Sequence, residues 1–131
     1  MPTASQNVET VQKFLETAFG QGRPQDAVDA YVGDHYIQHS PQVRDGKEGF
    51  TEMATEMAKS AGTFYPETKL VVANEQYVVM LTHFVMTDGS TPGRAFVDIM
   101  RLGDNGKIVE HWDVSQDIPP AEDFAHGNGM F

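Results

Sequence analysis

Two aspartates and a histidine lie close together near the end of this chain, among residues that otherwise favour β-structure. Because side chains alternate across a strand, Asp98 shares a face with Phe96 and Met100, and His111 shares one with Asp113. If such a face is buried, each carboxylate must be hydrogen-bonded, paired or protonated, since an isolated buried charge is too costly. A concave, partly wet pocket lined by one sheet would meet this requirement.

Two further histidines, His39 and His83, lie in other strand-like segments and could join the same pocket. Imidazole changes its charge near neutral pH, and burial can raise the pKa of an aspartate towards the same range. Together the five side chains could remove a proton α to a carbonyl group and stabilise the resulting enolate. In this hypothesis Asp113 is the base, assisted by His111 or His83, and Asp98 donates a hydrogen bond to the enolate.

A purely structural interpretation of each residue stays open. Asp98 and His83 could form a neutralised pair on neighbouring strands, and His111 could be a core histidine with satisfied hydrogen bonds. His39 could cap the turn that follows at Ser40-Pro41 instead of acting as a base. For the cluster as a whole, the number of titratable groups favours the lining of a functional pocket.

Other kinds of site have weaker signals. Three histidines and two aspartates could in principle ligate zinc, but there is no His-x-x-x-His pair, and His111-x-Asp113 alone is a poor signal. The chain has no cysteine and no Gly-x-Ser-x-Gly motif, so the usual signatures of a catalytic nucleophile are missing. Gly103-x-x-Gly106 is typical of a hairpin turn, not of a phosphate-binding loop. We therefore expect neither a metal nor a cofactor.

Length and charge narrow the class of partner. The chain has 131 residues, which suits a single domain, 1–131, with one core. Its formal net charge of −10 disfavours nucleic acid and anionic lipid as partners, but it does not exclude a hydrophobic small molecule. No apolar run approaches the roughly 18 residues that span a bilayer, and the N-terminus lacks the pattern of a signal peptide. With no cysteine, we expect a soluble, cytoplasmic protein.

The spacing of apolar residues changes from helical to strand-like about half-way along the chain. Three- and four-residue spacings predict helices over 5–19, 24–32 and 46–61. Strand patterns cover 36–39, 68–73 and 77–87, followed by a hairpin over 95–116 that turns at Asn105-Gly106. Residues 118–131 form an irregular tail, which we expect to dock on apolar surface through Met130-Phe131. Helices followed by an antiparallel meander predict an α+β fold: a cone-shaped, strongly bent antiparallel sheet wrapped around N-terminal helices.

The outer face of the hairpin predicts an interface. Arg101 should meet Glu110 across the two strands in a surface ion pair, and Trp112 lies on the face away from His111. A tryptophan on the convex side of a sheet is typical of packing or of an interface. We therefore expect a homodimer that packs through this outer face, with Trp112 and Val114 involved.

Several blocks of the sequence resemble the SnoaL-like polyketide cyclases, a family within the nuclear-transport-factor-2-like superfamily that also holds ketosteroid isomerase. The blocks are Tyr36–Pro41 with Gly46–Phe50, Val97–Arg101, and Gly106–Val114. Their order and spacing cover the chain from the first helix to Gln116. The resemblance implies a cystatin-like cone into which one face of each strand points. In the 77–87 strand that face would carry Tyr77, Val79, Leu81, His83 and Val85.

The resemblance also implies roles for individual residues. Asp98 matches the protonated acid in the oxyanion hole of ketosteroid isomerase, and His39 matches that enzyme's carboxylate base. Phe14 stands about where the oxyanion-binding tyrosine lies, so that donor is missing here. Asp113 is the nearest match to the aspartate that the cyclases use for acid/base chemistry. Two functions follow: a cofactor-independent cyclase or isomerase acting on a hydrophobic carbonyl compound, or a non-catalytic module that binds an apolar molecule in the same pocket.

Overall fold

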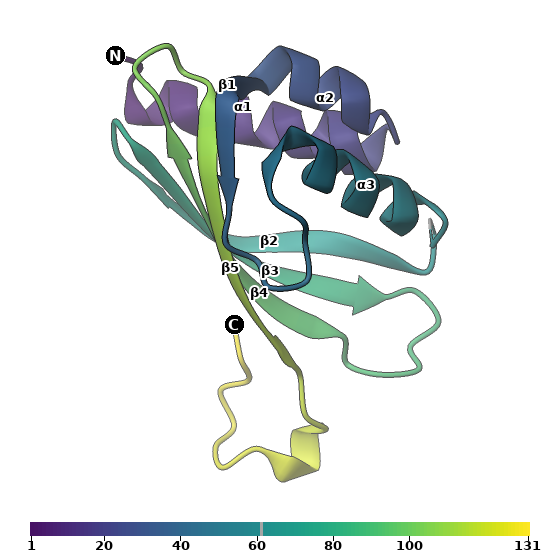
Figure 1. The fold of residues 1–131 in the computed structure, drawn as a ribbon. Coiled ribbons are helices and arrows are strands. Elements are labelled where there is room, and N and C mark those ends of the chain that lie inside the picture. Colours follow the sequence, from purple (N-terminus) through teal and green to yellow (C-terminus); the bar gives the residue numbers. More distant parts are fainter. Residues whose placement is uncertain (61) are drawn as a thin grey trace.

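A strongly bent sheet with helices gathered along one side dominates the computed structural model, which describes residues 1–60 and 62–131 (Figure 1). Over these residues the helices are α1 Ala4–Leu15, a π-helical turn Glu16–Gly20, α2 Pro24–Tyr31, α3 Gly46–Ala58 and a short 3-10 helix Ala121–Asp123. The strands are β1 Val32–Gln38, β2 Phe64–Ala73, β3 Tyr77–Met86, β4 Arg94–Leu102 and β5 Ile108–Asp117. The predicted α+β fold is confirmed. Ala61, the last residue of the third predicted helix, lies outside the described residues.

The helices bury one stripe each against the sheet and against one another. Thr3 begins α1 through a capping box with Gln6, which satisfies two backbone N–H groups that a helix start leaves free. In α1 the fully buried Val11 and Phe14 form the apolar stripe. The ring of Phe14 lies 4.9 Å from the ring of Phe50 in α3, centroid to centroid, so these two helices share one core.

The strand order in the sheet is β1-β5-β4-β3-β2. Strands β2 to β5 form the predicted antiparallel meander, but β1 pairs with β5 in parallel, so the sheet is mixed. The parallel pairing is possible because the whole of α3 and three strands connect β1 to β5. Register shifts between Thr68 and Leu70 and between Arg101 and Leu102 interrupt the ladders. Such irregularities bend and twist a sheet, which produces the curvature seen in Figure 1.

The inner face of the sheet, the side that meets the helices, is defined by the buried residues of β3: Val78, Met80 and Thr82. The alternate residues of β3, including His83, therefore lie on the outer face. The expectation that this second set points into the cone is wrong. Both faces of β3 are apolar, and the helices cover the one that carries Val78.

The C-terminal tail returns to the outer face of the sheet. Beyond β5 it contains the 3-10 helix and otherwise irregular backbone, and it lies past the lower end of β5 in Figure 1. The terminal Phe131 ring stacks on His83 at 4.9 Å, and the Lys69 ammonium lies 5.6 Å from the same ring. Among the described residues, no helix combines the length and the apolar character needed to cross a bilayer.

Candidate functional site

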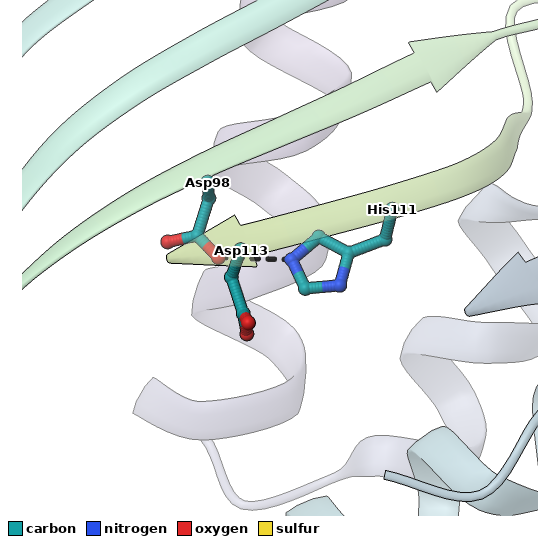
Figure 2. Close-up of side chains that lie close together, drawn as sticks. All are labelled: Asp98, His111 and Asp113. Carbon is teal, nitrogen blue, oxygen red and sulfur yellow. Dashed lines mark hydrogen bonds and ion pairs between the residues drawn. The ribbon is translucent and has the colours of Figure 1, made fainter. Parts of the chain in front are cut away.

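Asp98, His111 and Asp113 meet on the inner face, where β4 and β5 run side by side. Asp98 and Asp113 are directly opposite each other in the ladder, and His111 is opposite Met100. His111 Nε2 lies 2.9 Å from Asp98 Oδ1, a hydrogen bond that Figure 2 marks with a dashed line. One polar atom from each of the three side chains lies within 4.8 Å of the other two. The structure thus brings together three of the five predicted residues.

His111 is the most buried member of this Asp98–His111–Asp113 cluster, with 8% of the residue exposed. Its second ring nitrogen, Nδ1, lies 2.8 Å from Oε1 of Gln38 on β1. Both nitrogens of the ring therefore face an oxygen atom. Burial of an imidazole costs little free energy when each of its polar atoms has such a partner.

Asp113 differs from Asp98 in having no hydrogen bond within the part of the chain that the structure describes. Its carboxylate is half-buried and points past the His111–Asp98 pair (Figure 2). A carboxylate without a donor to satisfy it is free to accept a proton from a bound molecule. The two opposed aspartates are therefore not equivalent.

Aromatic rings continue the inner face beyond this cluster, near the start of β2, the end of β3 and the start of β4. Phe96 follows Asp98 along β4 by two residues and so lies on the same face. Its ring centroid is 4.4 Å from that of Phe84, which is 5.4 Å from that of Phe64. All three phenylalanines are half-buried, and they form an aromatic wall beside the carboxylates.

Two surface hollows of the structure lie elsewhere. One of about 360 Å³ lies between α2 and α3 and is lined in part by Arg44 and Glu52. Another, of about 510 Å³, lies beside the π-helical turn. Neither is lined by any residue of the Asp98–His111–Asp113 cluster. A pocket around that cluster stays a prediction.

His39 does not join the cluster. Its Nε2 lies 2.9 Å from Glu110 Oε1, and its ring stacks on Trp112 at 4.8 Å with an interplanar angle of 5°. Glu110 and Trp112 belong to the outer face, so the expectation that His39 points into the cone is wrong. The reason is register: Gln38 pairs with His111 on the inner face, which turns the next residue outwards.

His83 also lies apart from the cluster, on the outer face. Its Nε2 is 2.7 Å from the carbonyl oxygen of Pro92, and its ring packs on Phe131. The structural pair that we considered for Asp98 and His83 is therefore wrong, because Asp98 pairs with His111 instead. In contrast, the predicted cross-strand pair is confirmed: Arg101 Nε lies 2.7 Å from Glu110 Oε2.

Two polar residues of β1, Tyr36 and Gln38, were missed by the sequence argument. They stand two residues apart and both face inwards, with Gln38 Nε2 donating to the Tyr36 hydroxyl at 3.1 Å. Burial raises the pKa of Tyr36, and the charges of Asp98 and Asp113 add to this effect. Tyr36 is therefore a neutral phenol. Their alternation with Ile37 was the available signal for a polar inward face.

The three side chains of the cluster offer a histidine nitrogen and two carboxylate oxygens, a donor set that could ligate a divalent metal. The hydrogen bond between His111 and Asp98 accounts for the approach of these two without an ion. The expectation that no metal takes part stays a prediction, and it can be checked with a chelator.

The sequence matches the SnoaL-like domain family over residues 11–111. The chain belongs to the SnoaL-like family. No curated protein sequence matches it. The match includes two residues of the cluster, Asp98 and His111, and ends two residues before Asp113.

Solved structures support the SnoaL-like fold. A candidate SnoaL-like polyketide cyclase from Jannaschia sp. CCS1 is similar at 21% identity, with a TM-score of 0.69, over 88% of this chain and 89% of that one. A candidate polyketide cyclase from Bacillus cereus ATCC 10987 is 20% identical, with a TM-score of 0.69, over 85% and 74%. A candidate SnoaL-like isomerase from Agrobacterium tumefaciens C58 is 13% identical, with a TM-score of 0.70, over 86% and 98%. At these identities the likeness shows the fold alone.

Removing the central imidazole of this SnoaL-like domain should destabilise it. We expect His111→Phe to lower the free energy of unfolding by about 2 kcal/mol, because Asp98 and Gln38 each lose a buried partner. Urea denaturation measures this change. His35→Phe, at an exposed position of β1, is the control and should change stability by less than about 0.5 kcal/mol. Equal losses of unfolding free energy in the two variants would contradict the stabilising role assigned to the two hydrogen bonds of His111.

Glu110 should make stability depend on pH. The hydrogen bond from His39 lowers the pKa of Glu110, Arg101 acts in the same direction, and burial opposes them. A carboxyl group whose pKa is lowered by folding stabilises the folded state at pH values above its ordinary pKa. This stabilisation is lost as the pH falls through the pKa of the folded state. We therefore expect Glu110→Gln to cost about 1 kcal/mol at pH 7 and much less near pH 3. Urea midpoints across this range test it, and a pH-independent difference would count against it.

Proposed function

We propose that this SnoaL-like protein is an acid/base enzyme of cyclase or isomerase type, acting without a cofactor on a hydrophobic carbonyl compound. The observation that supports this most is the free carboxylate of Asp113 beside the hydrogen-bonded His111–Asp98 pair. A base and a donor side by side, with different hydrogen-bond environments, are what enolate chemistry requires. The cyclase and isomerase descriptions of structural neighbours fit the same class of reaction.

The proposed step uses three groups. The Asp113 carboxylate takes the proton α to the carbonyl carbon, and the electron pair of that C–H bond moves to the carbonyl oxygen. The oxygen, which gains negative charge, accepts a hydrogen bond from the proton shared by His111 and Asp98. Asp113 then returns its proton to carbon at another position, or the enolate carbon attacks a second carbonyl group of the same molecule, whose oxygen takes the proton from Asp113. The first outcome is isomerisation, and the second is aldol cyclisation.

The aromatic wall supports the choice of substrate class. Phe64, Phe84 and Phe96 form a half-buried row of rings, packed against one another, that begins two residues from Asp98 along β4. Flat apolar molecules gain free energy by covering such rings. We therefore propose a planar, largely aromatic compound whose carbonyl group lies at Asp98 and Asp113.

We keep the cytoplasm as the proposed location, since a chain without cysteine fits a reducing compartment.

Exchange of α-protons with solvent tests this chemistry without knowledge of the natural substrate. We expect the protein to accelerate deuterium uptake by 2-tetralone in D₂O, followed by NMR. Asp113→Asn should reduce this rate at least about 100-fold, because the amide cannot accept the proton. Its melting temperature should stay unchanged or rise, since a carboxylate without a partner does not stabilise the fold. EDTA should have no effect on the rate.

A matched control is Asp104→Asn, in the turn between β4 and β5, which should keep the full exchange rate. Saturable binding of 2-tetralone with no exchange, unchanged by Asp113→Asn, would favour the non-catalytic binding module instead. Unfolding of Asp113→Asn with no change in ligand handling would contradict the catalytic assignment of this residue.

We also propose that two copies of the chain pack through the outer sheet face. This face carries exposed apolar side chains, including Leu70, Val72 and Val114, beside Trp112. Its charged groups are paired within the chain, Arg101 with Glu110 and Lys69 with Glu67. The face thus offers little net charge to a charged partner, which favours self-association of apolar surface even in a chain of net charge −10.

A single charge on this face should separate the copies. We expect Val114→Asp, at a position that is 74% exposed, to convert a dimer into a monomer at micromolar concentration. The isolated fold should tolerate the change, because the side chain lies in solvent. Sedimentation equilibrium measures the mass, with Ser90→Asp in the β3–β4 loop as the control. A wild-type protein that is already monomeric would contradict the dimer.

A further inference from the structure

Gln38 is held in one orientation by contacts on every side of its amide group. It is the last residue of β1, and its backbone N–H donates to Asp45 Oδ1 at 2.9 Å. Its Oε1 accepts from the backbone N–H of Ser40 at 3.0 Å, and its Nε2 donates to the Tyr36 hydroxyl at 3.1 Å. Because a backbone N–H can only donate, the atom that faces Ser40 must be the oxygen of the amide. The two ends of the Gln38 side chain are thereby assigned.

This assignment fixes one proton on His111. The same Gln38 Oε1 lies 2.8 Å from His111 Nδ1. An amide oxygen can only accept, so Nδ1 must carry a hydrogen and donate it. The other nitrogen, Nε2, then lies 2.9 Å from Asp98 Oδ1. Two lone pairs at this distance would repel, so one proton lies between Nε2 and Asp98, on the imidazole or on the carboxyl group.

We propose that Gln38 is a positioning residue, which holds His111 with Nδ1 protonated and so directs the shared proton towards Asp98. Without Gln38, the imidazole ring could flip by about 180° or take the opposite tautomer. In that tautomer a neutral ring carries its hydrogen on Nε2 and donates it to Asp98, so no additional proton is shared between the two groups. With Gln38, the proton sits beside Asp113, where a developing enolate could use it. The catalytic consequence rests on the proposed function, but the tautomer does not.

Tyr36 supports Gln38 from the side away from His111. The buried phenol accepts the amide N–H, and it stays neutral because burial raises its pKa. The chain Tyr36–Gln38–His111–Asp98 therefore runs across β1, β5 and β4, with Gln38 donating to Tyr36 and accepting from His111. A positioning residue held in this way does not need to touch the substrate.

Nitrogen-15 NMR of the imidazole rings tests the proposal on the wild-type protein. We expect the Nδ1 resonance of His111 to be that of a protonated nitrogen, with a resolved coupling to its hydrogen. Gln38→Leu should lose this signature, whereas Gln38→Glu should keep it, since a carboxylate still accepts from Ser40 and His111. Gln25→Leu, at an exposed position of α2, is the control. An unprotonated Nδ1 in the wild-type protein at neutral pH would overturn the proposal.

Kinetics separate this proposal from the proposed function. With 2-tetralone exchange as the readout, Gln38→Leu should lower kcat about 100-fold at unchanged KM, and Gln38→Glu should recover most of it. A KM effect with full kcat in Gln38→Leu would overturn the positioning role. A protonated Nδ1 in a protein that never exchanges the α-protons of 2-tetralone would support the proposed tautomer of His111 and would contradict only the proposed function.

Discussion

The hydrogen bond between His111 and Asp98 joins β5 to β4 on the side of the sheet that the helices cover, and the polar part of this interior depends on it. A buried imidazole and a carboxylate are tolerated together because each satisfies the other, and Gln38 satisfies the remaining ring nitrogen. The opposed Asp113 is left without a donor among the described residues. One structural pair therefore creates the chemical asymmetry on which the proposed reaction relies.

Curvature decides how the two faces of the sheet are used. Register shifts bend β2 and β5, so the helices cover part of the inner face, while the aromatic wall of Phe64, Phe84 and Phe96 stays half-buried. The outer face is also apolar, and among the described residues Phe131 lies on His83 and His39 lies on Trp112 there. A sheet with two apolar faces can serve two purposes, a ligand on one side and a second copy on the other. This division is the physical basis of both functional proposals.

The fold was predictable from local patterns, because α1, α3 and the β4–β5 hairpin have clear periodicities and strong turn or cap residues. Which residues of β4 and β5 share a face was also predictable, because side chains alternate along each strand and the Asn105-Gly106 turn fixes where the hairpin begins. The faces of β1 and β3 were not, because each strand offers a large, partly or wholly apolar side chain to both faces: Tyr36 and Ile37 in β1, Val78 and Val79 in β3. Which face met the helices depended on register with β5 and β4, a long-range contact. His39 and His83 were misplaced for this reason, and Gln38 was overlooked.

Membership of the SnoaL-like family establishes the architecture, but it does not establish where a flat carbonyl compound would bind. The most direct measurement is a titration of the 15N-labelled protein with 2-naphthol, a planar mimic of an enolate, followed by chemical-shift mapping. We expect shifts concentrated at Phe84, Phe96, His111 and Asp113, with Trp112 and Val114 unaffected. Shifts confined to the outer face, or to the hollow between α2 and α3, would contradict this expectation.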